Sequence, residues 1–243
     1  MNRPLIALFA ALALGAAPVV RAADPDVTGL VPTIWWDFET QPDAGGLANA
    51  NKGSAGTSFS HEGTKTYKQG VGSDGWALDT SRFTPYSKAG TFSTVGNPIT
   101  VSLVMTLGSN PNGITLNVRT TAGDLIVRRG STEGSLVVGF GAQQAAQTQF
   151  LGATFADGDA AWHLVSVVGS PEGTALYVDG ELADSSADFT PWSASGKATQ
   201  MQFGGHLNVG AASGEAKNGG LIDDLRIHDA ALMPAQIKAI AQE

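Results

Sequence analysis

Short segments of alternating apolar and polar residues, separated by glycine and small polar residues about every ten positions, run through most of this chain. Val101, Leu103, Met105 and Leu107 illustrate the alternation. Residues two apart in a β-strand point to the same face, so one face of such a segment can be buried. The pattern predicts an all-β sandwich or barrel. The expected strands span residues 33–39, 76–80, 99–107, 114–120, 124–129, 135–140, 162–168, 174–178, 200–203, 207–209 and 221–228.

Turn residues support these boundaries. Asp179 and Gly180 both tolerate a positive φ, which predicts a tight hairpin after the strand over 174–178. The sequence Pro-Glu-Gly at 171–173 predicts a comparable turn one strand earlier, because proline presets φ and glycine is free to become left-handed.

One helix is expected, over residues 234–242 at the end of the chain. Proline suits the first helical position, and Ile237 and Ile240 fall on one face that can dock on the sandwich. Met233 stands where a capping hydroxyl is usually found, so packing has to hold this helix in place.

The first residues have the pattern of a secretory signal peptide. Arg3 precedes an apolar run over residues 5–17, and the sequence Val-Arg-Ala at 20–22 ends the segment. A bilayer span needs ~20 strongly apolar residues, so an uncleaved anchor is the weaker alternative. We expect residues 1–22 to be removed and residues 23–243 to form a single secreted or periplasmic domain that does not insert into a membrane.

Composition restricts the partners of this domain. The chain has no cysteine, which excludes disulfides and a lipid-modified N-terminal cysteine. After residue 22, 12 basic residues stand against 22 acidic ones, without a basic stripe. Such a surface repels phosphate backbones, so we expect no nucleic-acid partner.

Several short motifs share their order and spacing with one known family. They are WDFE at 36–39, GWAL at 75–78, the strand from residue 98 to 105, WHLV at 162–165, YVDG at 177–180, and GLIDDLRIH at 220–228 with the helix that follows. Together they resemble the laminin-G-like jelly-roll modules of the concanavalin A-like lectin/glucanase superfamily. The resemblance implies an antiparallel β-sandwich with one short C-terminal helix. Members of this family bind sugars, bind proteins, cleave glycans or act as spacers, so function has to come from the site.

Motifs for glycan cleavage are missing. Laminarinase-type hydrolases of this superfamily place two glutamates around an aspartate on one strand, with the two catalytic carboxyl groups ~5 Å apart. No two glutamates of this chain have that spacing after residue 22. Polysaccharide lyases on the same fold use Tyr and His, and residues 67–70 and 202–206 are similar to parts of their motifs, but the Tyr-Lys element lies on the opposite side of the sequence. We therefore expect no enzymatic activity.

His163 follows Trp162 where the family carries a Trp-His pair. It could act as a base, or it could be an exposed strand residue opposite a core tryptophan. No Ser, Cys or carboxylate motif stands beside it in the sequence, so the structural role is favoured.

Asp223 is the most informative charged residue. Strict alternation places Leu221, Asp223, Leu225 and Ile227 on one strand face, where an unpaired carboxylate would be costly. The family resemblance implies a structural Ca²⁺ held by oxygens of the first and last strands, which would be Glu39 and Asp223. The alternative is that Asp223 binds backbone N–H groups of a neighbouring loop without a metal.

Aromatic residues are candidate sugar platforms, because sugar rings stack on aromatic planes. Trp36, Trp76 and Trp162 alternate with apolar residues and are expected in the core. Trp192 and Tyr86 lie in segments without periodicity and are the expected ligand-binding residues. The favoured function is that of an exported, non-catalytic carbohydrate-binding module that takes a glycan or polysaccharide. A structural or protein-interaction module of the envelope or secretome is the alternative, and a glycan-cleaving enzyme is a remote one.

Overall fold

The structure is a computed structural model that describes residues 29–38, 53, 67–71, 75–80, 84–87, 98–111, 113–120, 123–141, 149–188, 198–203 and 220–243. The predicted signal peptide and the predicted strand over residues 207–209 lie outside these ranges.

The described residues form fourteen strands and one helix. They are β1 (Ile34–Trp36), β2 (Tyr67–Gln69), β3 (Trp76–Asp79), β4 (Thr84–Ser87), β5 (Ile99–Met105), β6 (Ile114–Thr120), β7 (Asp124–Arg129), β8 (Ser135–Gly141), β9 (Gln149–Thr154), β10 (His163–Ser170), β11 (Gly173–Val178), β12 (Glu181–Ser186), β13 (Ala198–Phe203), β14 (Leu221–His228) and α1 (Pro234–Ile240).

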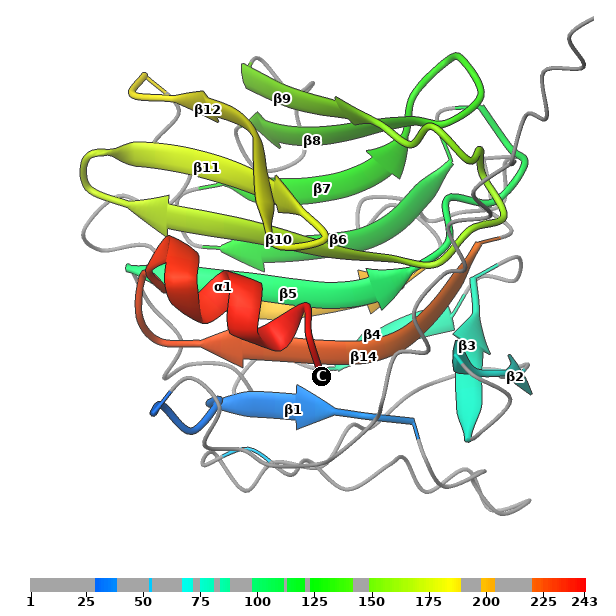
Figure 1. Ribbon diagram of the computed structural model, residues 1–243, viewed down its shortest axis with the longest axis horizontal. Coiled ribbons are helices and arrows are strands. Elements are labelled where there is room, and N and C mark those ends of the chain that lie inside the picture. The colour runs from blue at the N-terminus through cyan, green and yellow to red at the C-terminus, as the bar shows by residue number, and fades with distance from the viewer. Residues whose placement is uncertain are drawn as a thin grey trace, which may run out of the picture.

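These strands make two antiparallel sheets (Figure 1). Sheet A has eight strands: seven follow the order β12-β11-β10-β5-β14-β3-β2, and β1 pairs with β14. Sheet B has six strands in the order β4-β13-β6-β7-β8-β9. The predicted all-β antiparallel sandwich with one short C-terminal helix is therefore confirmed.

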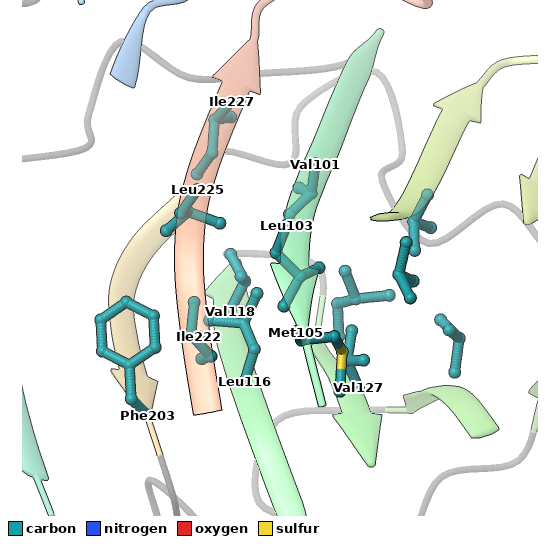
Figure 2. Close-up of a cluster of buried hydrophobic side chains, with 14 of the residues drawn as sticks. Val101, Leu103, Met105, Leu116, Val118, Val127, Phe203, Ile222, Leu225 and Ile227 are labelled. Atoms are coloured by element: carbon teal, nitrogen blue, oxygen red, sulfur yellow. The ribbon is translucent and has the colours of Figure 1, made fainter. Parts of the chain in front are cut away.

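One hydrophobic core lies between the sheets. Val101, Leu103, Met105 and Leu107 are all 0 % exposed, which confirms the alternation expected for β5. Figure 2 shows the side chains of β5 and β14 meeting those of β6 and β13 from the other sheet. Trp36 is 1 % exposed and belongs to this core. Trp76 and Trp162 are half-buried and lie outside the core cluster, contrary to expectation.

A β-bulge interrupts the alternation of β14. Ile222 pairs with Met105, whereas Leu225 pairs with Leu103, so β14 advances three residues while β5 advances two. Ile222 and Leu225 therefore both enter the core (Figure 2). The strict alternation assumed from the sequence was wrong here, because a bulge resets the side-chain period. Asp223 lies at the bulge itself.

Helix α1 covers the outer face of sheet A. Ile237 and Ile240 are buried in a second apolar cluster with Leu164, Val168 and other residues of β10 and β11 (Figure 1). The Met233 side chain adds no capping hydrogen bond, and Gln236 Oε1 accepts one from Met233 N at 2.9 Å. The expectation that packing holds this helix is confirmed, although the helix ends two residues earlier than predicted, at Ile240.

Two turns have the predicted backbone. Asp179 and Gly180, between β11 and β12, have φ values of 51° and 83°, as a type I′ turn requires. Gly173 follows the turn between β10 and β11 with φ 139°, and a Cβ there would clash with the Ser186 carbonyl oxygen. Only glycine fits that position.

Candidate functional site

Of the four residues predicted for sugar or metal binding, the structure describes two, Tyr86 and Asp223. Trp192 and Glu39 are outside the described residues. Tyr86 belongs to β4, at an edge of sheet B, and not to the loop expected from the sequence. Asp223 lies on β14 in the other sheet. One member of each predicted pair, Trp192 with Tyr86 and Glu39 with Asp223, lies outside the described residues, so both pairs stay predictions.

Asp223 is a buried carboxylate tied to a loop. It is 1 % exposed, and its Oδ2 accepts a hydrogen bond from the backbone N–H of Val71 at 2.7 Å. This contact joins the last strand to the residues after β2, as in the metal-free alternative. Within the described ranges, no three His, Cys, Asp or Glu residues converge as metal ligands. Because Glu39 is outside those ranges, the calcium site stays a prediction.

Asp224, the other aspartate of the pair, belongs to a structural network. Its Oδ1 accepts a hydrogen bond from Trp35 Nε1 at 2.9 Å, and its Oδ2 accepts one from Arg226 Nη2 at 2.7 Å. The Arg226 guanidinium lies 4.8 Å from the centroid of the Trp35 ring. These contacts fasten β1 to β14 and leave the carboxylate no evident role in ligand binding.

His163 differs from its sequence interpretation. It is 9 % exposed, so the expectation of an exposed side chain was wrong. Its two ring nitrogens face carboxylates from other segments: Nδ1 lies 2.7 Å from Asp179 Oδ2 and Nε2 lies 2.9 Å from Asp157 Oδ1. Burial lowers the pKa of His163, but hydrogen bonds to Asp179 and Asp157 and their charges outweigh it, so the pKa is raised above 6.5. No nucleophile accompanies this arrangement in the contacts that the structure describes.

A more promising surface lies on the outer face of sheet B. Its strands β7, β8 and β9 send Val127, Val138 and Leu151 into the core, so the residues next to these face outward. We call the outward surface the β7–β9 platform and define it by five residues: Arg128, Val137, Gly139, Phe150 and Gly152. Register places Arg128 beside Val137, Val137 beside Gly152, and Gly139 beside Phe150.

Phe150 is the exposed aromatic of this platform. It is 50 % exposed, and the Arg128 guanidinium carbon lies 5.9 Å from its ring centroid. Gly139 opposite it carries no side chain, and a Cβ added at Gly152 would meet only the Leu136 carbonyl oxygen at an ordinary 3.6 Å. The ring is therefore next to open space on its own strand and beside a glycine on the neighbouring strand.

Further along the sheet, the outer face of sheet B is not accessible to solvent at one pair of residues on β6 and β7. Asn117 on β6 and Ile126 on β7 pair in register, and they are 0 % and 1 % exposed. Among the residues of β6 to β9 whose burial the structure describes, the accessible part of this face therefore lies around Phe150 and Gly152, towards the β9 edge.

The chemistry of the platform suits a sugar ring. An aromatic plane stacks on the apolar C–H face of a sugar, and a guanidinium donates hydrogen bonds to hydroxyl or carboxylate oxygens. The sequence analysis did not find Phe150 because β9 was not predicted as a strand. The available signal was the sequence Gln-Phe-Leu-Gly-Ala-Thr at 149–154, in which Phe150 and Leu151 must take opposite faces.

Comparison with known proteins decides the family. The sequence profile described as the concanavalin A-like lectin/glucanases superfamily matches residues 79–238, which is more than half of the chain. The chain belongs to this superfamily. No curated protein sequence matches it.

Solved structures with the same fold include binding domains. Domain 4 of an extracellular arabinanase from Geobacillus stearothermophilus, in complex with arabinotriose, aligns with a TM-score of 0.60 and 16 % identity, over 87 % of this chain and 98 % of that one. The binding domain of botulinum neurotoxin DC in complex with rat synaptotagmin II aligns with a TM-score of 0.58 and 12 % identity, over 87 % and 51 %. The same toxin domain in complex with SialylT aligns with a TM-score of 0.57 and 12 % identity, over 88 % of this chain and 52 % of that one. The chain thus spans about half the length of the toxin domains, and at these identities the likeness concerns the fold.

Among the described residues, no helix is both long and apolar enough to cross a bilayer.

Proposed function

We propose that this chain is an exported, non-catalytic glycan-binding module and that the β7–β9 platform is its binding surface. The observation that carries the proposal is the half-exposed Phe150 ring, with the Arg128 guanidinium 5.9 Å from its centroid. An aromatic side chain on an outward strand position can stack on the apolar C–H face of a sugar, and this geometry favours that use.

Three further observations support the proposal. The superfamily is named for lectins and glucanases, and a structural neighbour binds arabinotriose. The sequence has no pair of glutamates at the strand spacing of the retaining hydrolases, which favours binding without cleavage. The segment over residues 1–22 favours export. Trp192 and Tyr86 remain predicted contributors to sugar binding.

A protein-interaction module is the second candidate. Val31, Leu182 and Met233 are apolar side chains that are 59 %, 58 % and 62 % exposed. One structural neighbour is a toxin domain in complex with synaptotagmin II. This function would use a surface other than the β7–β9 platform.

Three variants of the platform test the proposal in pull-downs on insoluble polysaccharides and on a glycan array. Phe150→Leu keeps most of the apolar volume but removes the aromatic plane, and Phe150→Tyr keeps the plane. Leucine should weaken glycan binding about tenfold, the loss expected from one stacking contact of ~1.5 kcal/mol, while tyrosine should bind as wild type does.

Gly152→Val tests the same surface by obstruction. A side chain at this position meets open space, so the valine variant should fold normally. The valine methyl groups should then block a ligand that binds on the platform. Met233→Ala is the matched control, because Met233 is 62 % exposed but directly precedes α1, which packs on the other sheet. Equal binding by the leucine, valine and control variants would remove the platform from the site. Glycan binding lost only in the control would place the sugar site outside the platform.

A further inference from the structure

His163 connects three segments that are distant in the sequence. It begins β10, and its ring lies between residues 155–159, which follow β9, and the turn that begins at Asp179. Asp157 and Asp179 are within hydrogen-bond distance of Nε2 and Nδ1, at 2.9 and 2.7 Å. The ring also lies against Phe155, with centroids 3.9 Å apart.

The two contacts require a particular protonation state. An ionised carboxylate only accepts hydrogen bonds, and a neutral imidazole has one N–H, so only the imidazolium form can donate to both aspartates. We propose that His163 is a pH-operated clamp, which in its protonated form fastens the loop at Asp157 to the turn at Asp179 and releases the loop when it loses its proton.

The surrounding contacts decide which attachment is released. Asp179 is held independently of the ring, because its Oδ1 accepts a hydrogen bond from Leu164 N at 2.9 Å and its own N–H donates to Leu164 O at 2.8 Å. The neutral ring therefore keeps its proton on Nδ1 for Asp179 and turns an unprotonated Nε2 towards Asp157. Two acceptors then face each other, and the contact with Asp157 is lost.

The release is local. Asp159, two residues beyond Asp157, accepts hydrogen bonds from Arg129 Nε at 2.8 Å and from Gly134 N at 2.7 Å. These hydrogen bonds do not involve His163, so they hold Asp159 in place whether His163 is protonated or neutral. Phe155 is 3 % exposed in the core, and its N–H donates to Gly134 O at 2.7 Å, so the chain is held before Asp157 as well. The segment that loosens is the stretch from residue 156 to residue 158.

The direction of the pH effect follows from the two carboxylates. The charged groups facing the ring are Asp157 from the loop and Asp179 from the turn, and together they raise the pKa of His163 above 6.5 although burial opposes them. A group whose pKa is raised by folding stabilises the folded state fully below its unfolded pKa. The stabilisation is lost as the pH rises through the folded pKa, so the clamp opens on the alkaline side.

Nuclear magnetic resonance of the full chain tests the clamp. The ¹⁵N shifts of the His163 ring, assigned with the variant His163→Gln, would be followed from pH 5 to 9. Both nitrogens should be protonated on the acidic side, with a midpoint above the one measured for the urea-denatured chain. The amide of Gly158, which donates to Phe155 O, should lose hydrogen-exchange protection over the same pH range, while the amide of Val167 in β10 should not.

Isosteric variants separate the clamp from a general charge effect. Asp157→Asn and Asp179→Asn should each lower the midpoint by about 0.5 pH unit or more, and asparagine tolerates the positive φ at position 179. Glu172→Gln removes the same charge at an exposed site in the turn between β10 and β11 and should leave the midpoint unchanged. A midpoint at or below that of the denatured chain, or equal midpoints in all three variants, would overturn the proposal. Gly158 protection that ignores the titration would also overturn it.

Discussion

Replacing Asp223 tests whether the last strand depends on a buried carboxylate. The side chain is 1 % exposed and accepts a hydrogen bond from Val71 N at 2.7 Å. Hydrogen bonds to charged groups contribute about 1.5–3 kcal/mol, and alanine would also leave the N–H of Val71 without this acceptor. We expect Asp223→Ala to lower the free energy of unfolding by about 2–3 kcal/mol, or the melting temperature by roughly 5–10 °C.

A second substitution at the same position separates hydrogen bonding from charge. Asp223→Asn keeps an oxygen that can accept from Val71 N, so it should cost about half as much as alanine, because neutral hydrogen bonds are roughly half as strong as charge-assisted ones. Thermal unfolding followed by circular dichroism measures all three proteins. An alanine variant that melts as wild type does would refute the burial argument.

The same melting curves test the predicted calcium. If Ca²⁺ is bound by Asp223 and Glu39, EDTA should lower the melting temperature of wild type and leave Asp223→Ala unchanged, because a ligand stabilises only the state that binds it. A wild type insensitive to EDTA would refute the metal and leave the hydrogen bond to Val71 intact.

Two other predictions concern acid stability and the loop aromatic. Burial and the Arg226 charge lower the pKa of His228 to about 4, from 6.5, so the folded state loses stability as the pH falls from 6.5 towards 4. The loss should reach about 3 kcal/mol in urea titrations, and the variant His228→Leu should lack it; equal acid sensitivity would contradict the assignment. Trp192→Ala should weaken glycan binding about tenfold and leave the melting temperature within a few degrees. A cost of ~3–5 kcal/mol would instead place Trp192 in the core.

Most strands could be predicted from the sequence, and the strands that end the two sheet orders could not. β1, β3, β5, β6, β7, β8, β10, β11, β13 and β14 were anticipated, since a buried face favours apolar residues at every second position. The four strands that were not predicted, β2, β4, β9 and β12, are the terminal members of the two sheet orders. An edge strand needs little apolar alternation, and β4 even contains Pro85, which is tolerated at an edge because one side of the strand has no partner.

The candidate site was harder to predict for two physical reasons. Phe150 lies on one of these edge strands, so no alternation of apolar and polar residues in the sequence indicated that its side chain faces outward. The surroundings of His163 come from a loop and a turn that only the fold brings together, 6 and 16 residues away from it in the sequence. Asp223 was predicted to be buried with a partner, because burying an unpaired carboxylate costs too much free energy. The bulge that positions it has no signal in the sequence pattern.

Mapping the contact surface of a glycan tests the central claim most directly. A polysaccharide retained in the pull-down would be cut to a soluble oligosaccharide and titrated into ¹⁵N-labelled protein, with amide shifts recorded for every strand. Binding at the β7–β9 platform predicts the largest shifts at Val137, Gly139, Phe150 and Gly152, and small shifts in β3, β14 and α1. Shifts centred on Met233 would place the glycan site elsewhere and contradict the account. The absence of any bound glycan would also contradict it and would favour a protein partner.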